Sequence, residues 1–437
     1  MLIQSILTGF ILSTLQPAPE HPVDRSDLVA KEIEELRSAI DAHRRNRLDA
    51  TSITDLERRQ DIQALVIDVL DDASGRTSFA GDDADRTWNQ LSSASGDFTL
   101  TMGVFTQFDW ALNARPGESR EYGSELQNVF LDFQGTLIDP SWSYWIRMTY
   151  GPDGPFNSGE QYAFIQRDLD DGWSVQAGLL TPYFSYEQAI DSVDQVGVNV
   201  SFIAGQFDPE SSEGLSVNWQ GDDLRSWVAV CNGFSPSDAS PLENQRTAAI
   251  GRVEWKLFGD WDDLYLPNAF PGMVEPGLLF GVGASYGDGT ARPEGSPPES
   301  GVDIRLTSDV VWQRPGASLL ASVSWQDASE QIPSGGLRLA SMIQGAFWPD
   351  AEKGGKAHWM LYARGEWGSV PDEEVSELGV ATLGSSWFSS EHRNIRWSIE
   401  LLRVWGDTTR WKIDGNPGFL SSDGPQSIIR SQVQIAF

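Results

Sequence analysis

Apolar side chains recur at every second position along most of this chain, and this period constrains its fold more than any other feature. From Phe98 to Leu112, nearly all residues of one parity are apolar, and those of the other parity are mostly polar or small. The pattern recurs in 142–150, 173–179, 302–312, 357–367 and 395–401. A period of two predicts β-strands with one apolar and one polar face. We count about sixteen such segments of roughly ten residues, which predicts an all-β fold, an antiparallel transmembrane barrel spanning 96–437.

The connections between these strands alternate in length. The short ones are 138–141, 168–172, 220–223, 313–316, 350–354 and 389–393, and the long ones are 113–124, 151–160, 180–213, 233–245, 287–300 and 406–425. Outer-membrane barrels show this rhythm because their periplasmic turns are short and their external loops are long. The connection 258–276 is long where a short turn is expected. Either it carries an insertion or the strand count slips there.

A soluble β-sandwich would also alternate apolar and polar positions. It would not explain the loop rhythm or the many Trp and Tyr residues near strand ends, which are typical of membrane interfaces. The last strand ends in Val433, Ile435 and Phe437, which resemble the signal that the bacterial outer-membrane assembly machinery reads on barrel proteins. The sequence therefore favours the membrane barrel.

The first 95 residues differ from the rest. The apolar run at 2–15 is about 14 residues long, too short for a membrane-spanning helix, so we assign 1–18 to a signal peptide, with a buried N-terminal helix as the alternative. Residues 19–75 carry apolar side chains at helical spacing and predict a periplasmic α-helical stem. Such a short stem needs a partner, either as a coiled coil with the same segment of other subunits or as a hairpin on its own chain. Residues 76–95 are expected to be a linker.

Composition excludes several functions. The chain has 63 acidic and 31 basic side chains and a formal charge of −32, which argues against nucleic-acid binding. The single cysteine, Cys231, and four dispersed histidines exclude a cysteine cluster or a local metal motif. No G-x-S-x-G elbow, P-loop or dinucleotide fingerprint is present. We therefore expect neither an enzyme nor a cofactor or metal site.

Part of the barrel resembles a known family. Residues 126–150, 161–169 and 172–188, followed by the sequence WVAVCNG at 227–233, are similar to the early barrel of the phosphate-selective porin O and P family. The resemblance implies a sixteen-stranded, trimeric bacterial porin whose third external loop folds into the lumen. The longest loop, 180–213, takes the place of that constriction loop.

The sequence departs from this family in its charges. The loop 180–213 is acidic and lacks basic residues, and the arginine pair of many such porins is replaced by Leu126 and Gln127. Its candidate constriction residues are Tyr183, Phe184, Tyr186, Glu187, Asp191, Asp194, Asp208 and Glu210. An acidic ring attracts cations and repels phosphate. The aromatic residues either stack on sugars or pack the loop against the wall.

The polar parity of the strands supplies the expected lumen lining. Its charged residues are Arg147, Arg252, Lys256, Arg305, Arg364, Arg396, Arg430, Asp109, Asp132, Glu254, Asp303, Asp309 and Glu400. Either the basic and acidic residues face each other and create an electric field across the lumen, or they pair across neighbouring strands and neutralise one another.

Two functions follow from these features. The first is a pore in outer-membrane lipid for small hydrophilic solutes and ions, weakly selective and leaning towards cations or neutral solutes. The second is a tether that joins the outer membrane to peptidoglycan through the stem. Phosphate uptake, as in the resembled family, is the alternative that the acidic loop disfavours.

Overall fold

The computed structural model describes residues 89–93, 97–151, 154–155, 162–234, 247–272, 274–288, 301–329, 336–371, 375–389, 394–411, 413 and 416–437. The chain divides into two compact units, 1–80 and 81–437, and all of the described residues belong to the second. The expected signal peptide and stem lie outside the described residues. Within the expected linker, β1 (Gln90–Ser92) is a short strand.

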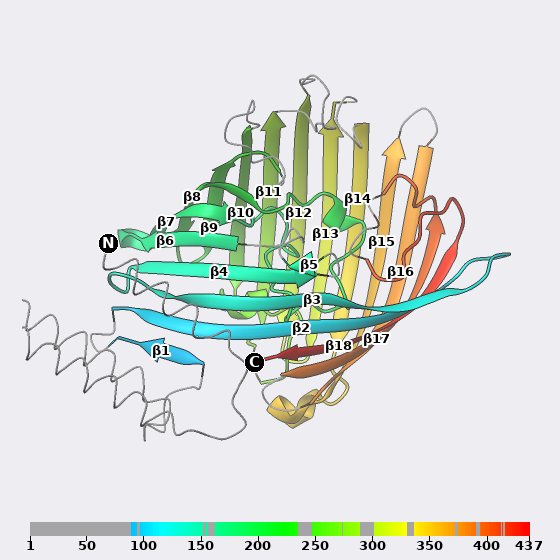
Figure 1. Ribbon diagram of the computed structural model, residues 1–437, viewed down its shortest axis with the longest axis horizontal. Helices are drawn as coiled ribbons and strands as arrows, with labels where there is room; N and C mark the ends of the chain where they lie inside the picture. Colours follow the sequence, from blue (N-terminus) through cyan, green and yellow to red (C-terminus); the bar gives the residue numbers. More distant parts are fainter. Residues whose placement is uncertain are drawn as a thin grey trace, which may run out of the picture. The chain divides into compact units, whose positions relative to one another are not determined.

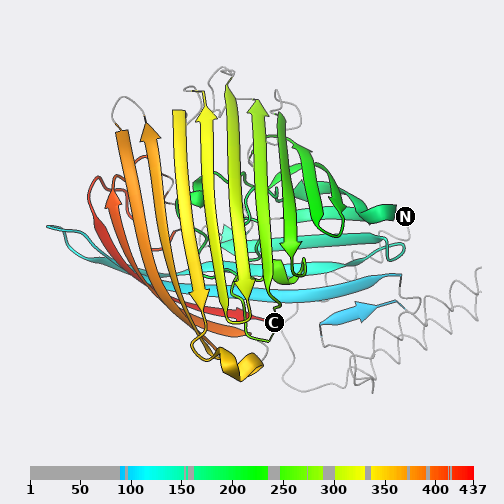
Figure 2. The same cartoon turned by 180° about the vertical axis from the view of Figure 1, so that it is seen from behind.

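Sixteen antiparallel strands form a closed barrel (Figures 1 and 2). The first seven are β2 (Thr99–Ala114), β3 (Glu121–Thr136), β4 (Trp142–Gly151), β6 (Tyr162–Asp168), β7 (Trp173–Leu180), β8 (Ser212–Gln220) and β9 (Leu224–Cys231). The other nine are β10 (Thr247–Phe258), β11 (Gly277–Asp288), β12 (Val302–Arg314), β13 (Ala317–Ala328), β14 (Gly336–Phe347), β15 (Trp359–Pro371), β16 (Val375–Phe388), β17 (Ile395–Gly406) and β18 (Gln426–Ala436). Each pairs with the next along the chain, and β18 closes the barrel against β2 with Ile429 opposite Leu112.

Two very short strands extend this barrel. β1 pairs with the start of β2, and β5 (Gly154–Pro155) pairs with the end of β4. The long strands β10 to β16 stand side by side as one wall, and β2, β3 and β4 run across the opposite wall (Figures 1 and 2). Among the described residues, no helix has the length and apolar character needed to cross a membrane.

The alternation of apolar and polar residues sets which side chains face inward. In β17, Arg396, Ser398 and Glu400 are buried inside the barrel, whereas Trp397 and Leu401 are exposed on its outer face. The same holds in β18, where Arg430 and Gln432 point inward. Successive strand residues point to opposite faces, so one parity forms the outer surface and the other lines the interior.

Successive connections lie at alternate ends of the barrel: most at one end are short, although 348–358 and 259–276 are not, and most at the other end are long, although 372–374 is not. We call these two ends the short-turn end and the long-loop end. The connection 259–276 joins β10 to β11 at the short-turn end. The strand order runs through it without a break, so this connection is an insertion in a turn and not a strand miscount.

Candidate functional site in the barrel lumen

A loop from the long-loop end runs through the interior of the barrel. This lumen loop, residues 181–211, joins β7 to β8 and contacts inward side chains from distant strands. Asp191 accepts a 2.8 Å hydrogen bond from Arg147 of β4. At other points of the wall, Arg305 of β12 donates to the Phe207 carbonyl and Gln432 of β18 donates to the Val198 carbonyl, both at 3.1 Å. The loop therefore crosses the lumen and narrows it.

Arg396 of β17 holds the middle of the lumen loop. Its buried guanidinium donates to the carbonyls of Val196 and Gly197, each at 2.8 Å, and to the carbonyl of Gln195. Hydrogen bonds from a charged donor are stronger than neutral ones. One arginine thus fixes three consecutive loop residues against the wall.

Glu400, two inward positions further along β17, holds the next residue of the loop. It accepts the backbone N–H of Val198 at 2.8 Å and the Tyr362 hydroxyl at 2.9 Å. Its other oxygen accepts from Arg430 of β18. Since Glu400 and Arg430 are both fully buried, their charges are balanced by each other and by hydrogen bonds, as a buried ion pair requires.

Arg364 and Glu366 of β15 hold the following part of the lumen loop. Glu366 accepts the N–H of Ile203 at 2.6 Å, and Arg364 donates to the Asn199 carbonyl at 3.0 Å. Arg364 also lies 3.8 Å from the carboxylate of Glu187, which accepts the N–H of Ser201 at 3.0 Å. Glu366 shares the inward parity of Arg364, but the sequence analysis did not select it.

The charged residues expected in the lumen all lie at inward positions, and most of them are paired. The pairs are Arg147 with Asp132 at 2.6 Å, and Arg252 with Asp309, Arg252 with Glu254 and Arg305 with Asp303, each at 2.7 Å. Lys256 lies with its ammonium 4.9 Å from the Trp261 ring, and Asp109 is buried opposite Gln432. Most of these charges therefore balance one another locally and do not form two opposed charged walls.

The acidic residues of the lumen loop do not form a free ring. Glu187 and Asp191 face the wall arginines described above, and Asp194 accepts from Asn268 at 3.3 Å. Asp208 lies in the interior, where burial raises the pKa of its carboxyl to about 7, and Glu210 is exposed. Basic residues of distant strands thus offset two of these five acidic residues, Glu187 and Asp191.

The three aromatic residues expected at the constriction differ in their exposure. Phe184 and Tyr186 are buried, and the Phe184 carbonyl lies so close to Gly283 of β11 that a Cβ there would be 2.1 Å from it. Tyr183 keeps 39% of its surface exposed and packs edge-on against Trp227 with ring centroids 5.5 Å apart. Only Tyr183 of these three is accessible to a solute.

The connection 259–276 also enters the barrel, from the short-turn end. Leu264 packs on Leu279 and Val311 of the wall, and Phe270 packs at 4.8 Å against Trp348. The Tyr186 hydroxyl of the lumen loop donates to the Leu264 carbonyl at 2.5 Å. The insertion and the lumen loop therefore meet inside the barrel. In the sequence, the apolar residues of an overlong turn were the only sign of this arrangement.

The connection 407–425 covers the long-loop end of the interior. Phe419 stacks on Phe202 of the lumen loop with ring centroids 4.4 Å apart, and Trp411 belongs to the same buried cluster. The cluster includes inward apolar residues of β16 and β17, such as Val380 and Val404. Much of the interior near β14 to β18 is therefore filled.

Open space remains on the opposite side, along β6 to β9. A cavity of about 280 Å³ lies there, lined by the neutral polar residues Gln166, Ser174, Gln176 and Asn218 together with Tyr183, Trp227 and Tyr265. These side chains come from three strands, the lumen loop, β9 and the insertion 259–276. This cavity is the candidate functional site.

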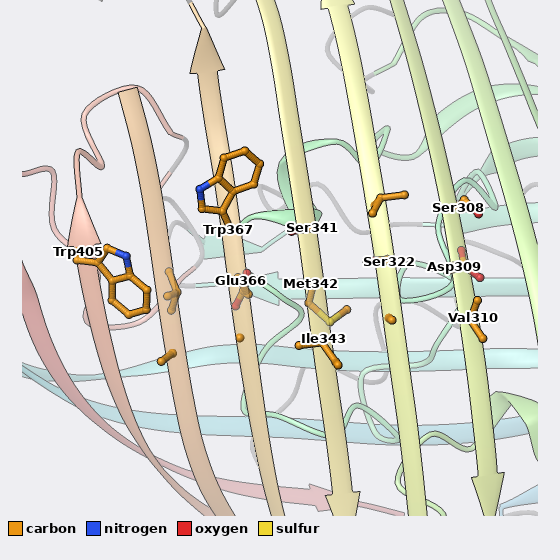
Figure 3. Close-up of a pocket in the computed structure, with 15 residues that line it drawn as sticks. Ser308, Asp309, Val310, Ser322, Ser341, Met342, Ile343, Glu366, Trp367 and Trp405 are labelled. Carbon is orange, nitrogen blue, oxygen red and sulfur yellow. The ribbon is translucent and has the colours of Figure 1, made fainter. Parts of the chain in front are cut away.

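A second hollow lies on the outer face, over β12 to β17 (Figure 3). Its lining includes the outward residues Ile343, Trp367 and Trp405, and its floor has small residues such as Ala321 and Gly365. Because these residues belong to the apolar outer parity, the hollow is part of the outer surface and not of the lumen.

Comparisons with known proteins agree with this architecture. No family model matches the sequence, and no curated protein sequence is detectably similar to it. Among solved structures, the anion-selective porin from Comamonas acidovorans aligns with a TM-score of 0.53 at 11% identity, covering 78% of this chain and 100% of that one. Salmonella typhi OmpF in complex with daunomycin aligns with a TM-score of 0.52 at 9% identity, covering 79% of this chain and 100% of that one. The trimer form of Vibrio cholerae OmpT aligns with a TM-score of 0.51 at 12% identity, covering 77% of this chain and 99% of that one.

These likenesses define the class of the fold, which is that of bacterial outer-membrane porins. At such low identities they show the fold alone and do not select a family within it.

Proposed function

We propose that the protein is a porin of the bacterial outer membrane, through which small hydrophilic solutes and ions diffuse passively. The observation that carries this proposal is the lumen loop, which crosses a closed barrel with a charged interior and an apolar outside. The outer face exposes large apolar side chains such as Trp255, Val323 and Leu383. An apolar surface of this extent suits lipid and not water. We propose no enzymatic role, cofactor or metal.

We further propose that the pore is only weakly selective and leans towards cations or neutral solutes. Phosphate selectivity would need cationic side chains that are free to meet the anion. Here Arg252 and Arg430 are paired with carboxylates, and Arg396 is bound to the lumen loop. Charges neutralised in this way contribute little to the field along a water-filled path.

Ion selectivity of the purified protein in a planar bilayer tests this proposal. In a KCl gradient, we expect a small reversal potential of cation-selective sign. A strongly anion-selective potential would contradict the proposed selectivity and favour phosphate uptake. A protein that inserts without any conductance would contradict the pore itself.

We propose that the protein assembles as a homotrimer with the stem 19–75 in the periplasm, where the stem also tethers the membrane to peptidoglycan. The supporting features are the helical spacing of Ile33, Leu36 and Ile40 and the trimer form of the OmpT structure. Deletion of 19–75 tests the tether. Loss of envelope integrity with normal conductance would support it, and unchanged integrity would contradict it.

A further inference from the structure

The cavity along β6 to β9 has a polar wall made of neutral side chains. Gln176 donates to Gln166 at 2.7 Å and accepts from Ser216 at 3.0 Å. At the next pair of inward positions towards the short-turn end, Asn218 donates to Ser174 at 3.1 Å. These amides and hydroxyls occupy five inward positions on β6, β7 and β8 and form two neighbouring hydrogen-bonded groups. Amides and hydroxyls both donate and accept hydrogen bonds, so they can adapt to a ligand with several hydroxyl groups.

The charged residues that border this cavity satisfy one another. Arg252 donates to Asp309 at 2.7 and 2.8 Å and to Glu254 at 2.7 Å. Arg225 and the Tyr265 hydroxyl also bond to Glu254. The two arginines and two carboxylates therefore balance in number and in hydrogen bonds. A charged solute would lose hydration here without gaining a free counter-charge from these four groups.

Two residues of the cavity lining each carry a buried polar atom without a hydrogen-bond partner among the described residues. The Trp227 side chain is only 5% exposed, and within the described part of the chain its Nε1–H has no hydrogen-bond acceptor. The Asn218 Oδ1 atom likewise lacks a donor among the described residues. An unsatisfied buried polar group is energetically unfavourable, so a solute that brings an acceptor to Trp227 Nε1–H and a donor to Asn218 Oδ1 would gain affinity from both contacts.

We propose that this cavity binds a neutral polyhydroxylated solute the size of a single sugar ring. A sugar hydroxyl accepts from Trp227 Nε1–H, another donates to Asn218 Oδ1, and the Tyr183 ring covers an apolar face of the sugar. The volume of about 280 Å³ lies just below the range of drug-sized pockets and suits one ring. This inference rests on the proposed pore, because the solute reaches the cavity through the lumen.

The test is block of single-channel KCl current by glucose, with inorganic phosphate as an anionic probe and glycine as a zwitterionic probe. We expect glucose to reduce the current with saturable concentration dependence, and phosphate and glycine to have no saturable effect. Trp227→Phe keeps the aromatic ring but removes the donor, and should weaken the apparent glucose affinity about fivefold, as expected for one hydrogen bond. Tyr183→Ala should weaken it about tenfold through lost stacking.

Trp255→Phe is the matched control. Trp255 lies on β10 but faces outward, with 56% of its surface exposed, so glucose block should be unchanged. If Trp227→Phe fails to assemble, Asn218→Ala tests the same site through its other free group. Equal block in wild type and Trp227→Phe, no block of a conducting channel, or equal block by phosphate would each overturn the sugar site while leaving the porin intact. A wild-type protein without conductance would overturn the porin proposal instead.

Discussion

Two buried side chains attach the lumen loop to β17, and Arg396 makes three of these hydrogen bonds whereas Glu400 makes one. Replacing Arg396 with methionine keeps an unbranched, flexible side chain, about as long as the arginine stem, but removes the guanidinium donors to the carbonyls of Gln195, Val196 and Gly197. Each hydrogen bond from a charged group contributes about 1.5–3 kcal/mol net. Lumen water will hydrate some of the freed carbonyls, so we expect the docked state of the loop to lose about 3 kcal/mol rather than the full sum. Such a loss lowers its equilibrium constant by more than about a hundredfold.

Single-channel recording measures this change directly. Arg396→Met should raise the mean conductance and add open-channel noise, because residues 195–197 of the lumen loop are no longer fixed against β17. Arg396→Lys should be intermediate, since an ammonium ion keeps the charge but not the planar geometry of the guanidinium. Arg403→Met is the control, because Arg403 lies on the same strand but is exposed, with a 2.7 Å hydrogen bond to Ser427. If Arg396→Met shows wild-type conductance and no added open-channel noise, Arg396 does not hold the lumen loop in the way proposed.

Two further predictions concern other parts of the interior. Phe270→Ala removes the packing of the insertion 259–276 against Trp348 and Phe388. It should cost about 3–5 kcal/mol in unfolding free energy and raise conductance; unchanged urea unfolding would contradict this. Asp208 of the lumen loop, with its pKa raised to about 7 by burial, is neutral in acid and ionised in base. Cation selectivity should therefore rise between about pH 6 and 8, and Asp208→Asn should abolish this rise. Since the folded pKa of Asp208, about 7, lies above the ordinary 3.8, its ionisation should destabilise the fold progressively as the pH rises from about 4 to about 7.

The sequence alone determined the barrel and the direction of its side chains. A period of two assigns each strand residue to the outer or inner face without knowledge of its neighbours, and this is why Arg396, Glu400 and Arg430 could be placed inside from residue order alone. The long-loop and short-turn rhythm likewise pointed to the residues around 180–213 as the largest loop, because loop length is a property of the chain itself.

Only the tertiary structure decided what those inward residues contact. Arg396 and Gly197 are 199 residues apart in the chain, and Tyr186 and Leu264 are 78 apart, so no local pattern relates them. Curling of the sheet into a closed barrel brings these segments together. It places two carboxylates of the acidic lumen loop, Glu187 and Asp191, against wall arginines. It also places the overlong turn 259–276 inside the barrel, where it packs against the wall. The unsatisfied Trp227 donor is also invisible in the sequence, because satisfaction of a hydrogen bond depends on partners that only the closed barrel supplies.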